Sequence, residues 1–194
     1  MLIYRESKRT KEILLSLCIT KYSLSQTLLD KLSSQILAEF PIGSKILDFQ
    51  IMSLSLIHSD SLTGTYDYSD QIDFLQGSQH FYTEILNGFK FQVAPLAFFQ
   101  VNSHVFEKML SKISDWAKLD DRTVLLDLCC GTGVIGICLS KHVKKIIGIE
   151  LIESAIENSR KNLEINGLDV KDEERFLYIA GKCEDVLPEL SKKI

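Results

Sequence analysis

The sequence predicts an α/β fold in which helices alternate with the strands of a parallel, doubly wound sheet, preceded by a small α+β domain. One observation behind this is that short apolar runs alternate with helical patterns after residue 121. Another is the stretch LLDLCCGTGVIG at residues 125–136, which has the order apolar strand, glycine turn and helix. We place the domain boundary after residue 88, so residues 1–88 form the α+β domain and residues 89–194 form the α/β domain.

The net charge, the apolar runs and the cysteine content of the chain argue against several classes of protein. A formal net charge of −4 over 194 residues argues against a broadly basic surface for nucleic acid. No apolar run approaches the ~20 residues that cross a bilayer, and the N-terminus has no apolar targeting segment. We therefore expect an intracellular protein, cytoplasmic or nuclear, with a mitochondrial location left open and no membrane partner. Five cysteines without a C-x-x-C pair or zinc-ligand spacing predict reduced thiols and no metal, and we expect a monomer.

The first domain begins with a strand and a helix. The apolar, partly alternating run at residues 12–20 predicts the strand. Ser23 or Ser25 then caps a helix in which leucine and isoleucine recur at helical spacing up to Phe40. A second β-like run follows at residues 46–57, so strand, helix and strand form a small α+β unit.

Residues 66–93 contain two signals for turns or loops. Residues 66–79 are rich in serine, aspartate and glycine, so we expect a loop there. The segment at residues 80–93 predicts two strands joined at Asn87-Gly88, because Asn-Gly is the strongest short signal for a hairpin.

A helix is expected after Asn102, whose side chain caps the first turn. This structural role is sufficient, so we assign Asn102 no part in catalysis. The helix continues to Trp116, and the residues that we expect on its inward face are Val105, Met109, Leu110 and Ile113.

The pattern of the second domain is strand and helix in alternation. Strands are predicted at residues 124–128, 146–150 and 176–180, and helices at residues 133–141, 152–166 and near 187–190. The strands of such a sheet are parallel, and ligands bind beyond their carboxyl ends. A doubly wound sheet normally has about five to seven strands, so we expect the chain to be a fragment that carries the N-terminal half of the sheet.

The glycine turn predicts a site for a nucleoside cofactor. Gly131 and Gly133 let the backbone turn tightly and approach a ligand, at a helix start whose N–H groups are unsatisfied. Glu150 ends the next predicted strand, where a carboxylate accepts hydrogen bonds from both hydroxyls of a ribose. Asp127 does not suit a pyrophosphate, but it suits a ligand with an ammonium or sulfonium group. This favours S-adenosylmethionine over a dinucleotide.

Other interpretations stay open on these residues alone. GTGVIG also matches the G-x-G-x-x-G pattern of a nicotinamide cofactor site, and Asp127 can also be explained as a cap for the turn. Glu184 or Asp185, after the third predicted strand, is placed to meet an adenine amino group. Either is also explained as an acidic cap for the next helix.

Four motifs occur in order along the second half of the chain: PLAFFQVN, LLDLCCGTGVIG, IIGIELIESAIENSRKNLEINGL and AGKCEDVLP. The set resembles the S-adenosylmethionine-dependent RNA (uracil-5-)-methyltransferases, most closely the animal tRNA members of that family. The resemblance extends from about residue 81 to the end, with a fainter echo before it. It implies a Rossmann-like class I methyltransferase domain, of which this chain holds the N-terminal half.

The resemblance also implies the cofactor, S-adenosylmethionine, and its contacts. In similar members the glutamine of FFQVN contacts the cofactor, and this glutamine is Gln100 here. Cys129 stands where bacterial relatives commonly have tyrosine, which leaves a contact from its side chain open. The full set of expected cofactor-binding residues is Gln100, Asp127, Cys129, Gly131, Gly133, Glu150 and Glu184.

The activity that the resemblance implies is methylation of uridine carbon 5 in tRNA. In that family a cysteine thiolate adds to carbon 6, carbon 5 takes the methyl group, and a glutamate base removes the proton from carbon 5. Both groups are expected beyond Ile194, and none of the five cysteines matches the nucleophile motif. We therefore expect this chain to carry only the cofactor part and to be inactive alone. The alternatives are a non-catalytic RNA-binding or interaction module and a nicotinamide-dependent oxidoreductase.

Overall fold

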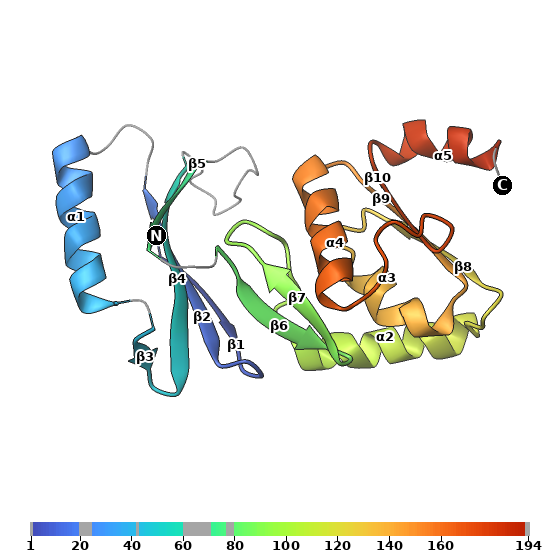
Figure 1. Cartoon of the computed structure of the whole chain (residues 1–194), viewed down its shortest axis with the longest axis horizontal. Helices are drawn as coiled ribbons and strands as arrows, with labels where there is room; N and C mark the ends of the chain where they lie inside the picture. Colours follow the sequence, from blue (N-terminus) through green and yellow to red (C-terminus); the bar gives the residue numbers. More distant parts are fainter. Residues whose placement is uncertain (1, 20–24, 42, 60–70, 77–79, 193–194) are drawn as a thin grey trace. The chain divides into compact units, whose positions relative to one another are not determined.

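The computed structural model describes residues 2–19, 25–41, 43–59, 71–76 and 80–192 (Figure 1). The chain divides into two compact units. The first is Met1–Glu84 with Val93–Ala97, and the second is Ile85–Gln92 with Phe98–Ile194. The division after residue 88 stays a prediction. Within the described ranges, no helix is both long enough and apolar enough to cross a bilayer.

Among the described residues, the first unit holds a five-stranded sheet and one helix (Figure 1). The strands are β1 (Leu2–Ser7), β2 (Glu12–Ile19), β3 (Lys45–Ile46), β4 (Phe49–His58) and β5 (Gln71–Gln76). β2 and β4 are parallel, and the other neighbours are antiparallel. The helix α1 (Gln26–Glu39) supplies the crossover that a parallel pair needs. Ile36 and Leu37 of this helix pack against a core cluster of Ile13, Leu15, Ile51 and Leu54.

The strand and helix predicted at the start of this unit are confirmed, with Ser25 as the cap. Two features differ from the prediction. β1 is an additional strand whose charged residues interrupt the apolar pattern, which an edge position tolerates. The loop prediction is wrong for residues 71–76, because β5 pairs with β4 and Leu75 joins the core cluster. Residues 66–70 and 77–79 of that loop lie outside the described residues.

The predicted hairpin is confirmed. β6 (Tyr82–Leu86) and β7 (Phe89–Val93) form a two-stranded sheet. Asn87 and Gly88 join them with φ angles of 48° and 80°. Two consecutive residues with positive φ are the geometry that a tight two-residue turn requires.

In the described part of the second unit, three parallel strands alternate with helices, as predicted (Figure 1). The strand order is β10 (Phe176–Ala180), β9 (Lys145–Glu150) and β8 (Val124–Leu128). The helices that follow β8, β9 and β10 are α3 (Val134–Leu139), α4 (Glu153–Ile165) and α5 (Cys183–Ser191), and the 3-10 helix η1 (Ser140–His142) extends α3. The carboxyl ends of the three strands therefore lie at one edge of the sheet.

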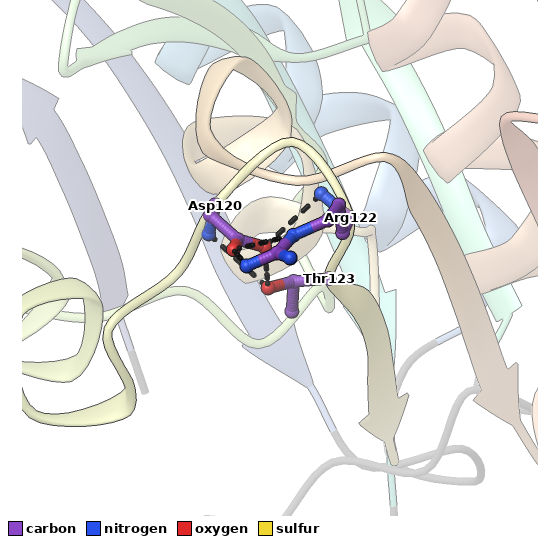
Figure 2. Close-up of polar contacts among 3 residues, drawn as sticks. All are labelled: Asp120, Arg122 and Thr123. Atoms are coloured by element: carbon purple, nitrogen blue, oxygen red, sulfur yellow. Dashed lines mark hydrogen bonds and ion pairs between the residues drawn. The ribbon is translucent and has the colours of Figure 1, made fainter.

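Asp120 holds the turn that leads into β8 (Figure 2). Its Oδ2 accepts a hydrogen bond from Nη2 of Arg122 at 2.8 Å, and its Oδ1 accepts one from the Thr123 hydroxyl at 2.9 Å. The Arg122 hydrogen bond holds the pKa of Asp120 below its ordinary value. The Thr123 carbonyl accepts a hydrogen bond from the Lys144 amide at 2.9 Å, which ties the start of β8 to the start of β9.

The starts of two helices can be compared with the prediction. Asn102 caps α2 (Ser103–Ala117) as predicted, since its Oδ1 accepts a hydrogen bond from the Val105 amide at 3.0 Å. α5 begins at Cys183, earlier than the predicted start near Leu187. The acidic residues of its first turn favour this earlier start, because negative charge stabilises a helix N-terminus.

The inward face of α2 differs from the predicted one. Phe106 and Leu110 are the buried residues of the helix. Val105 and Met109 are exposed, so the prediction that they face inward is wrong. The large side chain of Phe106, the residue after Val105, is buried instead. The buried face of α2 is therefore shifted by one residue from the predicted inward face.

Two asparagines, Asn162 of α4 and Asn166 directly after this helix, bond to the second strand of the hairpin. Asn162 accepts a hydrogen bond from the Gln92 amide at 3.0 Å and donates one to the Thr132 carbonyl at 3.1 Å. Asn166 bonds both the amide and the carbonyl of Lys90, at 2.8 and 2.7 Å. Asn162 is fully buried, whereas Asn166 is half-buried. Asn162 therefore links the hairpin directly to the glycine turn.

Replacing Asn162 by alanine should lower the free energy of unfolding by about 2–4 kcal/mol, because the Gln92 amide and the buried Thr132 carbonyl lose their partner. Asn166→Ala is the matched control. It should cost only about 1 kcal/mol, because water can reach its partners at the exposed Lys90. Urea unfolding measures both values, and equal losses would contradict the bridging role of Asn162.

Candidate cofactor-binding site

The turn between β8 and α3 has an unusual backbone. Three of its residues have positive φ: Cys129 at 58°, Gly131 at 56° and Gly133 at 77°. Gly133 is the N-cap of α3, and the Cys130 amide donates to the Ile149 carbonyl at 3.1 Å. The turn is therefore anchored on β9, and its left-handed positions explain why glycine occupies two of them.

Tyr178 of β10 fills the space beneath this turn. A Cβ atom at Gly148, its register partner on β9, would lie 2.5 Å from the Tyr178 ring. Cβ atoms at Gly136 and Gly133 would lie 2.9 Å and 3.0 Å from the Tyr178 hydroxyl. The distances at Gly148 and Gly136 are shorter than packed interiors accommodate, so Tyr178 requires glycine at these two positions, and a Cβ atom at Gly133 would make a tight contact with it.

Gly131 has a different role from Gly133. A Cβ atom at Gly131 would meet no other atom within 4 Å, whereas one at Gly133 would also lie 3.0 Å from Cβ of Ser159. Both glycines are predicted to let the backbone approach a ligand. The structure separates them, because Gly133 faces the packed interior and Gly131 faces open space.

Glu150 ends β9 beside the turn. Its Oε2 accepts a hydrogen bond from the Gly131 amide at 3.0 Å, and its Oε1 accepts one from the Ile152 amide at 3.1 Å. The side chain is half-buried, and each carboxylate oxygen keeps a further lone pair for a ligand. The structure thus brings Gly131 and Glu150 into direct contact.

Asp127 lies near the end of β8 and is only 7% exposed. Its Oδ2 accepts a hydrogen bond from the Gly136 amide at 3.3 Å. Burial raises the pKa of Asp127 to about 6; the Gly136 hydrogen bond opposes the rise, and the charge of Glu150 adds to it. A cation beside this carboxylate would favour its charged form. The electrostatic setting therefore suits a ligand with an ammonium or sulfonium group.

A cavity of about 100 Å³ opens beside the turn. Gln100, Cys129 and Gly131 line it, together with the exposed ring of Phe98 and the buried ring of Phe99. Three of the predicted cofactor residues therefore meet at one cavity, although they come from two separate segments of the sequence.

The other predicted site residues lie outside the lining of this cavity. They are Asp127, Gly133, Glu150 and Glu184. Glu150 is joined to the cavity through its contact with Gly131. Glu184 is exposed in the first turn of α5, and its contact with a cofactor stays a prediction.

Two residues that shape the site are not among the predicted ones. Tyr178 supports the turn from below, and Asn162 bonds the Thr132 carbonyl within it. Gly148 is the signal that points to Tyr178, because a glycine inside a strand marks a close approach by another group. No local pattern distinguishes Asn162 from the polar surface residues of its helix.

A family model and curated relatives indicate the family of this chain. The family model described as tRNA (Uracil-5-)-methyltransferase matches residues 41–176, more than half of the chain. The tRNA (uracil-5-)-methyltransferase homolog B of Danio rerio is 42% identical over 62% of this chain and 24% of its own length. An RNA methyltransferase of Clostridium tetani is 32% identical over 99% of this chain and 39% of its own length. The chain spans less than half of the length of these relatives.

Solved structures show the same fold. The tRNA (uracil-54, C5)-methyltransferase of Pyrococcus abyssi, solved with S-adenosyl-L-homocysteine, has a TM-score of 0.65 at 24% identity and covers 93% of this chain and 38% of its own. Trm5 of Methanocaldococcus jannaschii, solved with adenosine, has a TM-score of 0.53 at 17% identity and covers 93% of this chain and 48% of its own. The second unit therefore has the Rossmann-like class I methyltransferase fold.

Alanine at Gly131 and at Gly133 should have different effects on stability. Gly131→Ala should lower the free energy of unfolding by about 1–2 kcal/mol, the cost of a left-handed residue with a side chain in open space. In Gly133→Ala the new Cβ atom would also crowd Tyr178 and Ser159. The free energy of unfolding of this variant should therefore fall by about 2–5 kcal/mol in total. Denaturant titration measures both, and equal losses would contradict the separate roles.

Asparagine at Asp127 should stabilise the protein free of ligand. Because the pKa of Asp127 is raised to about 6, the folded state binds more protons than the unfolded chain between roughly pH 4 and 6, and the free energy of unfolding falls as the pH rises through that range. Asp127→Asn removes this penalty and should gain up to about 3 kcal/mol near pH 7.5, but little near pH 4.

Asp120, which is half-buried and whose pKa is lowered, offers the matched control. Asp120→Asn should show no gain near pH 7.5, because the charged form of Asp120 is favoured in the folded state. Thermal unfolding at both pH values compares the two variants. A loss of stability in Asp127→Asn near pH 7.5 would show that burial of this carboxylate does not oppose folding.

Proposed function

Because this chain belongs to the tRNA (uracil-5-)-methyltransferase family, we propose that it supplies the S-adenosylmethionine site of an enzyme that methylates carbon 5 of uridine in tRNA. The observation that carries the proposal is the pair of carboxylates at the glycine turn. Glu150 contacts Gly131, and Asp127 is buried beside the same turn. A dinucleotide would bring the negative charge of a pyrophosphate close to both carboxylates.

The residues present fit an adenosyl amino acid. Glu150 keeps lone pairs that can accept hydrogen bonds from two ribose hydroxyls. Gly131 leaves open space where a ligand can approach the backbone. Burial raises the pKa of Asp127, so a nearby positive charge would stabilise its charged form. S-adenosylmethionine carries a ribose that suits Glu150, and an ammonium and a sulfonium that suit Asp127.

The bound cofactor supplies a methyl group on a sulfonium sulfur. In our proposal Glu150 binds the ribose. The ionised carboxylate of Asp127 attracts the positive charge of the methionine end of the cofactor and so orients that end. Gln100 and Cys129 contact the cofactor from the cavity that they line with Gly131. Glu184 reaches toward the adenine amino group from the first turn of α5.

The buried cysteines of the second unit are poor candidates for the nucleophile that the family chemistry needs. Cys130 and Cys138 are buried, and burial raises the pKa of both thiols, that of Cys138 to about 12. A raised pKa lowers the fraction of reactive thiolate. In our proposal this chain binds and orients the cofactor, and tRNA is the substrate of the enzyme.

Calorimetric titration of the chain with S-adenosylhomocysteine and with NAD tests the cofactor assignment. We expect S-adenosylhomocysteine to bind and NAD to give no heat of binding. Glu150→Gln should weaken binding by about 10–100-fold, because losing a charged acceptor costs roughly 1.5–3 kcal/mol. Glu153→Gln, an exposed carboxylate in the first turn of α4, is the matched control and should bind like the unmodified chain.

Binding of NAD without S-adenosylhomocysteine would overturn the assignment and favour an oxidoreductase. An equal loss in the two glutamine variants would overturn the role of Glu150. In a separate assay with unmodified tRNA and labelled S-adenosylmethionine, we expect no 5-methyluridine from this chain alone. Formation of 5-methyluridine would overturn the restriction of the chain to cofactor binding.

A further inference from the structure

Tyr178 carries a buried hydroxyl whose role the packing of its ring does not explain. The hydroxyl oxygen is out of contact with solvent, and no group in the described part of the chain forms a hydrogen bond with it. Buried polar groups in proteins almost always have a partner, because an unpaired one has lost its hydrogen bonds to water. The hydroxyl therefore needs a role that a phenylalanine at this position could not fill.

The register of the sheet places Tyr178 and Asp127 in one row. Gly148 of β9 pairs with Asp127 of β8 on one side and with Tyr178 of β10 on the other. Residues in register on neighbouring strands point to the same face of a sheet. A Cβ atom at Gly148 would lie 2.5 and 2.6 Å from two carbons of the Tyr178 ring, so the ring fills the space above this glycine. The tyrosine therefore reaches from β10 across β9 towards β8.

The hydroxyl of Tyr178 and the carboxylate of Asp127 approach each other beside Gly136 of α3. A Cβ atom at Gly136 would lie 2.9 Å from the tyrosine hydroxyl oxygen and 3.8 Å from Oδ2 of Asp127. Both oxygens therefore lie within 4 Å of one point. The Gly136 amide donates to the same Oδ2 at 3.3 Å, and Asp127 is buried. A buried hydroxyl without a hydrogen-bond partner thus lies beside a buried carboxylate.

A hydroxyl that has no other partner can turn its O–H dipole towards a charge. Side-chain hydroxyl dipoles orient in the field of nearby charges, and the attraction is stronger in the protein interior than in water. Burial raises the pKa of Tyr178 well above its ordinary value, so the hydroxyl keeps its proton at neutral pH. The hydroxyl can therefore stabilise a charge on Asp127 without any movement of the ring.

We propose that Tyr178 is a positioning residue, which stabilises the ionised carboxylate of Asp127 by directing its hydroxyl proton towards it. Tyr178 contacts no ligand in this role and acts through Asp127. The effect on cofactor affinity rests on the function proposed above, whereas the effect on the ionisation of Asp127 does not. Without the hydroxyl, Asp127 stays protonated up to a higher pH, and a cationic ligand meets a neutral carboxyl group over a wider pH range.

The other titratable groups around Asp127 and Tyr178 do not stabilise the charged carboxylate. These groups are Glu150, Cys129, Cys130 and Cys138. Burial raises the pKa of Asp127 to about 6, and the charge of Glu150 on β9 raises it further. Raised pKa values keep the thiols neutral near pH 7; burial is the main cause for Cys130 and Cys138, and the neighbouring Cys183 is the main cause for Cys129. The Gly136 amide opposes the rise at Asp127, and the Tyr178 hydroxyl acts in the same direction as this amide.

A pH titration of the full chain by carbon NMR, with labelled aspartate carboxyl groups, tests the proposal without a ligand. The Asp127 signal is the one that Asp127→Asn removes. In Tyr178→Phe, which keeps the ring over Gly148, the pKa of Asp127 should rise by at least about 0.5. Tyr82→Phe removes the hydroxyl of a buried tyrosine in the first unit and should leave this pKa unchanged. An unchanged or lowered pKa in Tyr178→Phe would overturn the proposal.

Thermal unfolding near pH 4.5 separates this role from support of the fold. Asp127 is mostly protonated at that pH, because its pKa is about 6. Tyr178→Phe should then be at least as stable as the unmodified chain, since it loses only a hydroxyl that has no neutral partner in the described part of the chain. An unfolded or clearly less stable variant at pH 4.5 would contradict a role that depends on the charge of Asp127.

Titration with S-adenosylhomocysteine at about pH 6 and pH 8 tests the effect on the site. Tyr178→Phe should weaken binding about two- to fivefold at the lower pH and change it little at the higher pH, where Asp127 is ionised in both proteins. In Asp127→Asn the same tyrosine substitution should change the affinity at neither pH. Equal weakening at both pH values would overturn the proposal. Absence of binding to the unmodified chain would instead contradict the proposed function, and the NMR titration would still decide the role of Tyr178.

Discussion

The close packing of Tyr178 against backbone is the constraint on which the site depends. Its ring would clash with a Cβ atom at Gly148, its hydroxyl would clash with one at Gly136, and a Cβ atom at Gly133 would be crowded by it, so sheet, turn and helix approach one another closely. This packing holds the glycine turn in the position where Gly131 meets Glu150. The packing of Tyr178 thus positions the glycine turn beside the end of β9, where Glu150 lies.

The carboxylate of Asp127 is buried beside the same turn, and its charged form destabilises the folded protein. A carboxylate that is 7% exposed, with a pKa raised to about 6 and one hydrogen bond from the Gly136 amide, opposes folding when it is charged. A cationic ligand would recover part of that free energy, so the cost to the free protein favours binding. Stability and affinity are therefore expected to respond in opposite directions when this side chain is neutralised.

The sequence predicts what depends on neighbouring residues in the chain. The glycine turn, the hairpin at Asn87-Gly88 and the cap at Asn102 are local, and all three are found where expected. Tyr178 and the inward face of α2 depend on which segments pack together, so periodicity alone misplaces or misses them. A sequence pattern can indicate that a glycine is needed, but only the register shows which side chain needs it.

The measurement that tests the central claim most directly is the number of protons exchanged when S-adenosylhomocysteine binds. Calorimetry near pH 6, in buffers with different heats of ionisation, gives this number. If Asp127 is a buried carboxylate beside the ammonium group, binding lowers its pKa from about 6 and releases a fraction of a proton, and Asp127→Asn abolishes the release. Binding without proton release, or with the same release in the variant, would contradict the account.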